Sequence, residues 1–243
     1  MEHAPCISQI ATLLADPKRS AMMWALMDGS ARQTEELALL AGLSPSSASA
    51  HLGRLSAGGL LKVEVRGRKR FFRLAAPEIA AAIEALASAT IASAPREIPH
   101  VFKRSAPSAN PRTAPSSLLR ARFCDDHLGG TLAADLYQRL LDAGWLEQIE
   151  QRVVVTLKGS TQLANRGVFI QALAHRKAQV ACACPDWSER RPHLGGSLGA
   201  AVLQLFMQSG WLVLPKDSRA LQVTPAGQRE IQRFAKETEL ELA

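Results

Sequence analysis

The sequence predicts a mainly α protein with small β-hairpins, an α+β fold, in two halves joined by a proline-rich segment. Three observations lead to this prediction. Apolar residues recur at helical spacing over most of residues 1–92, broken by one alternating stretch. Residues 93–117 contain repeated prolines and no apolar period, so they are typical of a linker. Residues 118–243 contain one motif twice, which predicts a second domain with an internal repeat.

The composition is that of a globular protein. The chain has 243 residues, 47% of them hydrophobic and 21% charged, which is enough to bury a core. No uncharged apolar run is long enough to span a bilayer, and the first residues lack the basic start of a signal peptide, so we expect a cytoplasmic protein with no membrane partner. Four cysteines are too few for a disulfide scaffold.

Three helices are expected at the start of the chain. Ile10, Leu13 and Leu14 share one face of a first helix. A second helix should begin at Pro17 behind Asp16 and end near Gly29. A third, TEELALLAGL, should begin at a capping Thr34 and end at Gly42, with its acidic residues at the positive end of the helix dipole.

The next segment is the most informative. Ser44 and Pro45 form a cap followed by proline at the first helical position, and the helix behind them has small polar residues opposite its apolar face. Residues 61–74 then alternate around a turn at Gly67, which predicts a hairpin with a basic tip, and an alanine-rich helix follows over 76–92.

This order of elements predicts a winged helix-turn-helix that binds double-stranded DNA. The second helix of the pair would enter the major groove N-terminus first, and the basic hairpin would contact the phosphate backbone. Taken singly, the helix could be an ordinary surface helix and the arginine run a solvated hairpin tip.

The segment LAGLSPSSASAHLGRLSAGGLLKVEVRGRKRFFRL resembles the core of the ArsR/SmtB family of winged helix-turn-helix repressors. The resemblance implies a homodimer joined through the first and last helices of residues 1–92, a palindromic operator and release by an effector. It implies recognition-helix contacts from Ser46, Ser47, Ser49, Ala50, His51 and Arg54, and wing contacts from Arg66, Arg68, Lys69 and Arg70.

The chain departs from that family at its metal sites. Founding members bind metals through a CxC run on the third helix or through Asp, His and Glu on the last helix of the winged domain. The corresponding segments here, TEELALLAGL and APEIAAAIEALASATIA, contain neither Cys nor His. Metal sensing at those positions is therefore not expected.

The repeat in the C-terminal half spans residues 118–163 and 178–235. CDDHLGGTLAADLYQRLLDAGWL in the first copy matches CPDWSERRPHLGGSLGAAVLQLFMQSGWL in the second. Each copy predicts a helix, a strand or hairpin after GWL, and a helix capped by Thr156 or Thr224, which is the order of a winged-helix-like element. Leu163, Phe169, Ile170 and Leu173 predict a helix between the copies. The copies lack an arginine-rich wing, so we expect an effector or dimer-support domain.

Chemically reactive residues gather in the two motifs. The candidate effector-binding residues are Cys124, Asp126, His127, Cys184, Asp186, Trp187, Arg190, Arg191 and His193. Cys and His could bind a soft metal or act as redox thiols. Trp187 with Arg190 or Arg191 could instead hold a small organic anion. These residues could also be structural: a capping His, buried cysteines and a salt-bridged helix start.

The function predicted from the sequence is a sequence-specific DNA-binding regulator, a repressor released by an effector in the C-terminal half. A metal- or thiol-responsive regulator using Cys124, His127, Cys184 and His193 is one alternative, and a nonspecific nucleic-acid-binding protein is another. An enzyme with a Cys–His nucleophile–base pair on a helix is disfavoured, because no phosphate loop, HExxH or GxSxG motif accompanies it.

Overall fold

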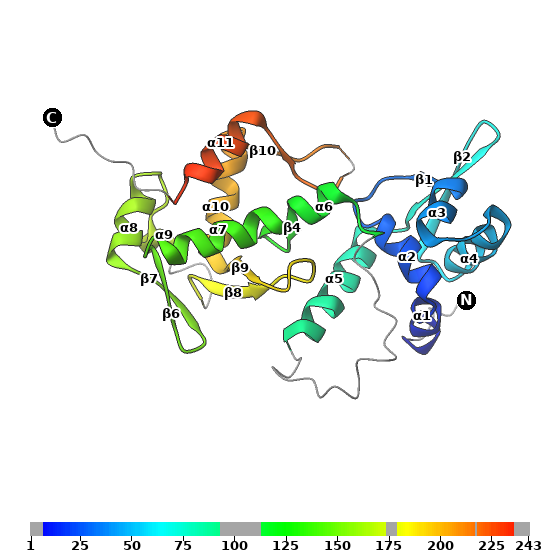
Figure 1. The fold of residues 1–243 in the computed structure, drawn as a ribbon, viewed down its shortest axis with the longest axis horizontal. Helices are drawn as coiled ribbons and strands as arrows, with labels where there is room; N and C mark the ends of the chain where they lie inside the picture. The colour runs from blue at the N-terminus through cyan, green and yellow to red at the C-terminus, as the bar shows by residue number, and fades with distance from the viewer. Residues whose placement is uncertain (1–6, 93–112, 174–178, 217, 236–243) are drawn as a thin grey trace. The chain divides into compact units, whose positions relative to one another are not determined.

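The computed structural model describes residues 7–92, 113–173, 179–216 and 218–235. The chain divides into two compact units (Figure 1). The first consists of Met1–Leu118 with Asp217–Arg219, and the second of Leu119–Lys216 with Ala220–Ala243. Most of the proline-rich segment predicted as a linker, 93–112, lies outside the described residues.

The first unit is built on five helices. They are α1 (Ile7–Leu14), α2 (Pro17–Ala25), α3 (Thr34–Ala41), α4 (Pro45–Ala57) and α5 (Pro77–Ala92). The predicted caps of α2 and α4 are confirmed: Asp16 accepts from the amides of Lys18 and Arg19, and Ser44 accepts from the amide of Ser47. The predicted cap at Thr34 is wrong, because Thr34 is the first helical residue and Gln33 occupies the cap position without a side-chain hydrogen bond.

The predicted hairpin is confirmed and forms part of a larger sheet. Strands β2 (Leu61–Arg66) and β3 (Lys69–Leu74) pair antiparallel, and β1 (Arg32–Gln33), which the sequence analysis missed, adds to the other edge of β3. Leu61 and Leu74 are buried at the base, whereas Val65 is 70% exposed near the tip. The hairpin therefore projects beyond the core, as Figure 1 shows.

The second unit contains the repeat. Its elements are α6 (Ser116–Arg120), β4 (Arg122–Cys124), β5 (His127–Gly129), α7 (Thr131–Asp142), β6 (Leu146–Ile149), β7 (Arg152–Val155), α8 (Leu157–Ala164), α9 (Ile170–Leu173), β8 (Cys182–Pro185), β9 (Pro192–Gly195), α10 (Gly196–Gln208), β10 (Leu212–Val213), β11 (Gln222–Val223) and α11 (Pro225–Arg233). From β4 and from β8, the order is the same: hairpin, long helix, hairpin, helix.

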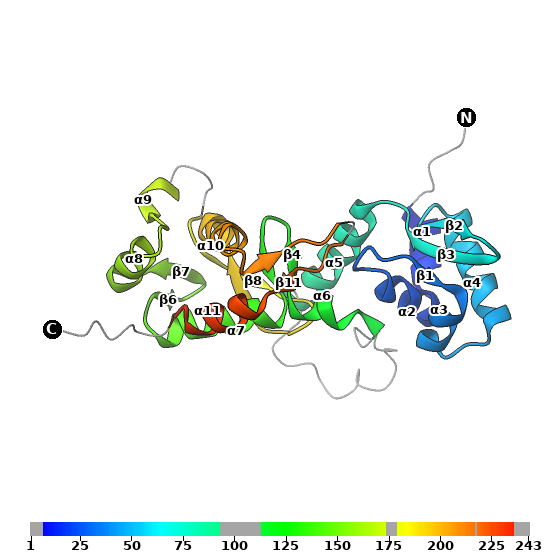
Figure 2. The same ribbon diagram turned by 90° about the horizontal axis from the view of Figure 1, so that it is seen from above.

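The two copies interlock. Helix α7 of the first copy packs against β9 of the second, α10 of the second packs against β5 of the first, and β5 contacts β9. Both long helices lie beside the β8–β9 hairpin in Figures 1 and 2. A single apolar core, centred on Trp145, Phe206 and Phe234, runs through both copies. Neither copy could bury its apolar face alone.

The hairpin after each GWL ends in the predicted threonine cap. The hydroxyl of Thr156 accepts from the amide of Gly159 at 2.9 Å, and that of Thr224 accepts from the amide of Gly227 at 3.0 Å. Each hydroxyl also lies within donating distance of two carbonyls of its own GWL sequence. These are the carbonyls of Gly144 and Trp145 for Thr156, and those of Gly210 and Trp211 for Thr224. These contacts tie the start of the last helix of each copy to the end of its long helix.

Two predictions for this unit need correction. The stretch after Leu163 is not one helix, because α8 ends at Ala164, α9 is a single turn, and residues 182–185 form strand β8. In each motif, the cysteine, the aspartate two residues after it and the histidine neither lie on a helix nor cap one. They lie on the hairpins β4–β5 and β8–β9, which the sequence analysis did not predict.

Candidate functional site

The exposed face of α4 carries the predicted DNA-reading residues. Ser46, Ser47, Ser49, Ala50 and Arg54 are all exposed, whereas Ala48, Leu52 and Leu55 face the core. The residues that could approach a base edge are therefore small, apart from Arg54 at the C-terminal end. We refer to these five exposed residues as the recognition face.

His51 occupies a different position from the recognition face. Its side chain is only 20% exposed, and its Nδ1 lies 3.8 Å from Oδ1 of Asp16, the cap of α2. That separation is too long for a hydrogen bond but is close enough for electrostatic attraction when the ring is protonated. His51 therefore lies at the junction of α4 and α2.

The hairpin tip is positively charged. Glu64 is shared between Arg66, at 2.7 Å, and Arg73, at 2.6 Å, and these guanidinium groups hold the pKa of Glu64 below its usual range. Among the described residues, no carboxylate pairs with Arg68 or Lys69 at the turn. The tip therefore carries cations whose charge no neighbouring carboxylate offsets.

In the second unit, the hairpins bring two cysteines and two histidines together. Cys124 pairs in register with His127 across β4–β5, and Cys184 pairs with His193 across β8–β9. Between the hairpins, the two Sγ atoms are 3.9 Å apart and the two Nε2 atoms are 3.1 Å apart. All four atoms lie within 4.8 Å of one another, and we call this group the Cys–His cluster.

Each histidine of the cluster has a carboxylate behind it. Nδ1 of His127 lies 3.2 Å from Oδ1 of Asp126. Nδ1 of His193 lies 3.1 Å from Oδ2 of Asp186, but the angle of this second contact is not that of a hydrogen bond. A carboxylate at Nδ1 keeps the proton on that nitrogen and leaves Nε2 free to act as a ligand. Both histidines thus present Nε2 to the centre of the cluster.

Asp186 is the most heavily hydrogen-bonded of these groups. It accepts from Nη2 of Arg122 and from the amide of Gly130, both at 2.8 Å, and from the hydroxyl of Ser188 at 2.6 Å. Burial alone would raise its pKa, but His193, Arg122 and Ser188 together hold the pKa of Asp186 well below its usual range. The carboxylate is therefore charged whenever the unit is folded near neutral pH.

The two thiols are coupled to each other. Their contact, together with burial, raises the pKa of Cys124 to about 11, and the same contact lowers the pKa of Cys184. The pair therefore loses a first proton more readily than a second. No disulfide joins them, and a sulfur–sulfur separation of 3.9 Å is far longer than the bond of about 2.05 Å.

The repeated LGG sequence makes room for the cluster. A Cβ on Gly195 would lie 3.2 Å from Cβ of Cys184 and 3.4 Å from Nε2 of His127, and one on Gly129 would lie 3.0 Å from Cβ of Cys124. The second glycines, Gly130 and Gly196, have φ of +94° and +79°, and a Cβ on either would lie less than 3 Å from a backbone carbonyl oxygen. The LGG sequence is thus explained by the lack of room for a Cβ atom at either glycine.

The predicted organic-anion fork is not assembled. Trp187 is buried and stacks under the guanidinium of Arg122, at 4.2 Å from the ring centre. Arg191 is exposed and pairs with Asp135 at 2.8 Å and with Glu189 at 3.3 Å, and Arg190 is exposed on a turn with φ of +55°. The residues DWSERR form this turn, so they do not start a helix either.

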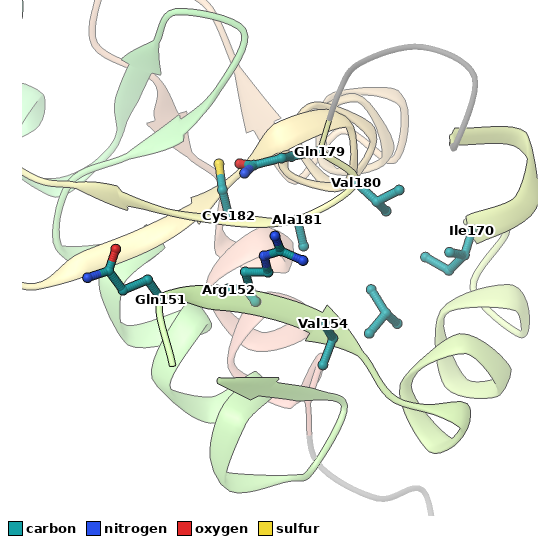
Figure 3. A pocket seen from close by; sticks show the side chains of 10 residues that line it. Gln151, Arg152, Val154, Ile170, Gln179, Val180, Ala181 and Cys182 are labelled. Atoms are coloured by element: carbon teal, nitrogen blue, oxygen red, sulfur yellow. The ribbon is translucent and has the colours of Figure 1, made fainter. Parts of the chain in front are cut away.

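A cavity of about 530 Å³ lies elsewhere in the unit, between β7 and the start of β8 (Figure 3). Arg152 is the charged residue among those that line it, and Val154, Ile170 and Val180 provide apolar walls. Cys182, two residues before Cys184, is at its edge. The sequence analysis did not anticipate this cavity, because its lining residues come from separate elements.

Arg122 and Ser188 were also missed. Both hold Asp186, and Arg122 is 1% exposed although it carries a charge. A signal was present in the sequence: Arg122 lies two residues before Cys124, as Cys182 lies two before Cys184. The arginine thus replaces a cysteine at the equivalent position.

A capped recognition helix, packed on α2 and α3 and followed by a basic hairpin, defines a winged helix-turn-helix, and the protein is a DNA-binding transcriptional regulator. The chain is 34% identical over 223 residues to the HTH-type transcriptional regulator YdfF of Bacillus subtilis (strain 168), covering 92% of this chain and 94% of the relative. It belongs to the family of HTH-type transcriptional regulators that YdfF represents. No protein-family model matches the chain.

Solved structures resemble parts of the chain. A homodimeric winged helix-turn-helix domain from Mycobacterium bovis, a possible ArsR-family regulator, is 22% identical, with a TM-score of 0.34 over 39% of this chain and 86% of its own. The cadmium sensor CMTR of Mycobacterium tuberculosis is 32% identical, with a TM-score of 0.30 over 40% of this chain and 100% of its own. None of the described helices is long and apolar enough to cross a membrane.

Proposed function

We propose that this protein is a cytoplasmic repressor that binds a palindromic operator as a homodimer and leaves it when an effector binds the C-terminal half. The observation that carries the proposal is the recognition face beside a cationic hairpin tip. Small exposed side chains at the start of α4 let the helix backbone approach the floor of the major groove. Base contacts and phosphate contacts would then come from different elements.

Serines on the recognition face supply the sequence preference in this proposal. The hydroxyl of Ser47 is engaged with that of Ser44 at 3.0 Å, so it belongs to the cap network. Ser49 is exposed two residues further along, and Arg54 follows on the same helix. Arg66, Arg68, Lys69 and Arg70 supply phosphate contacts, which add affinity without discriminating between sequences.

Unpartnered apolar surface on the first unit supports the homodimer. Helix α1 buries none of its residues, and Ile7 is 85% exposed. Leu86 on α5 is 64% exposed and borders an apolar groove that Met23 and Trp24 also line. A second copy covering these helices would remove this surface from water and place two recognition helices on two half-sites of a palindrome.

The effector site is proposed in the second unit, around Cys124, Asp126, His127, Cys184 and His193. The convergence of two thiols and two imidazoles favours a metal- or thiol-responsive regulator over one that binds an organic anion through Trp187, because Arg122 already covers that ring.

We place the domain division at 1–92, 93–117 and 118–243. Ser218 and Arg219 are an exception, because they group with the first unit.

Titration of the purified chain onto its own upstream DNA and onto scrambled DNA, at several salt concentrations, tests the proposal. A specific regulator prefers one duplex, whereas a nonspecific nucleic-acid-binding protein binds both alike. Ser49→Ala should reduce the preference by about 1–3 kcal/mol if Ser49 contacts a base edge. The matched control is Ser117→Ala, an exposed serine on α6. Equal affinity for both duplexes would refute operator recognition.

A further inference from the structure

We propose that the Cys–His cluster is a metal site that binds one zinc-class divalent cation through Sγ of Cys124 and Cys184 and Nε2 of His127 and His193. Tetrahedral zinc, with bonds of about 2.3 Å to sulfur and 2.0–2.1 Å to nitrogen, separates two sulfurs by about 3.8 Å and two nitrogens by about 3.3 Å. The corresponding separations here are 3.9 Å and 3.1 Å. The two sulfurs and the two nitrogens are thus already spaced for the ion, and all four ligand atoms lie within 4.8 Å of one another.

Charge supports the same assignment. Two thiolates and two neutral imidazoles neutralise a divalent cation, which suits a site whose histidines are 6% and 0% exposed. The two thiol protons would be released to water on binding. Sulfur and imidazole ligands select zinc-class ions over magnesium, calcium or manganese, which prefer oxygen.

The groups behind the ligands are those that a metal site requires. Asp126 and Asp186 each lie at Nδ1 of a histidine, at 3.2 Å and 3.1 Å, and so orient Nε2 inward. Without a cation, the two Nε2 atoms approach each other at 3.1 Å inside the protein, and only one proton can be shared between them. Gly129 and Gly195 keep Cβ atoms away from the cysteines.

The site joins the two copies of the repeat. One Cys and one His come from β4–β5, and the other pair comes from β8–β9, with cysteine facing cysteine and histidine facing histidine. Four protein ligands complete a tetrahedron and leave no position for substrate, so the ion is a cross-link rather than a catalyst. We therefore expect it to stabilise the C-terminal unit. This inference deepens the effector site proposed above by naming its ligand, and its test measures metal binding alone, so failure of operator recognition would leave it standing.

Cobalt substitution of the full-length chain tests the site directly. Stripped, reduced protein titrated with Co²⁺ should develop thiolate-to-cobalt charge-transfer absorption and the strong d–d bands of a tetrahedral ion, saturating at one ion per chain and abolished by zinc. Cys124→Ser should lose the charge-transfer absorption from one thiolate and at least tenfold in cobalt affinity. Cys182→Ser, two residues before a proposed ligand on the same strand, is the matched control and should bind like the parent chain.

A second variant and a second readout keep the test independent of folding. Asp126→Asn, on a half-exposed side chain, should fold and still give a tetrahedral spectrum while losing about 10–100-fold in zinc affinity. Peptide mapping after alkylation should show that zinc protects Cys124 and Cys184 but not Cys182. An octahedral cobalt spectrum, unchanged binding in Cys124→Ser, or no cobalt uptake by the reduced chain would each overturn the proposal.

Discussion

Aspartates in this protein have different roles, which depend on whether water reaches their side chains. Asp186 has no exposed side-chain surface and neutralises Arg122, whereas Asp135 pairs with Arg191 where both side chains are 47% exposed. Water screens the second pair and not the first, so the two similar distances of 2.8 Å represent very different energies.

Asp186→Asn should therefore destabilise the C-terminal unit strongly. The substitution removes the carboxylate charge that faces the buried guanidinium of Arg122, and removing one partner of a buried ion pair costs about 3–5 kcal/mol. Urea unfolding of the metal-free chain, followed by Trp fluorescence, measures the change. Asp135→Asn is the control and should change the free energy of unfolding by less than about 1 kcal/mol. Similar losses in both variants would contradict the assignment of a buried ion pair.

The hairpins of the two units differ in the side chains that they position. The β2–β3 hairpin projects charge into solvent, whereas β4–β5 and β8–β9 turn their cysteines and histidines toward each other. The hairpins after each GWL serve a third purpose, since their last threonine caps a helix. Antiparallel hairpins thus present exposed charge, bring the cysteines and histidines together, and position a helix cap.

Replacing Arg68 and Lys69 together by alanine should weaken binding to operator and scrambled DNA by similar factors. Each lost phosphate contact should reduce the slope of log affinity against log salt by about 0.9. Arg73→Ala removes a cation already paired with Glu64, so a smaller change of slope is expected. A double variant with the parental slope would exclude these residues from the DNA interface.

Gly159→Ala should destabilise the C-terminal unit. A Cβ there would lie 2.0 Å from the carbonyl oxygen of Trp145, and the backbone would have to move to accept it. Overpacking of this kind costs about 1–3 kcal/mol. The control is Thr161→Ala on the exposed side of the same helix, where little change is expected. Thermal unfolding of both variants beside the parent decides between them, and equal midpoints would contradict the close packing.

At the scale of the whole molecule, the two units divide the work that we propose. The recognition face and basic hairpin belong to the first unit, and the Cys–His cluster belongs to the second. One segment crosses this division in sequence: the amide of Arg219 donates to the carbonyl of Asp28 at 2.9 Å, and its guanidinium pairs with Glu84. The first unit is thus completed by residues from far along the chain.

A fragment of residues 1–92 should keep its preference for the operator over scrambled DNA but should not respond to zinc or to a chelator, because all four proposed ligands lie beyond residue 118. It should be less stable than in the intact chain, since Arg219 is missing. Operator titrations with size-exclusion chromatography measure both affinity and dimerisation. A fragment whose affinity still changed with zinc would place metal sensing in the first unit.

Elements whose signals are local can be predicted from the sequence alone. The caps at Asp16, Ser44, Thr156 and Thr224 and the hairpin turn at Gly67 depend on neighbours a few residues away, and each was predicted correctly. The repeat was also visible in the sequence. How the two motifs come together could not be predicted, because the geometry of the cluster depends on contacts between residues 60 positions apart, such as Cys124 with Cys184. Burial of Arg122 and pairing of the two histidines are properties of the packed copies, and no local pattern encodes them.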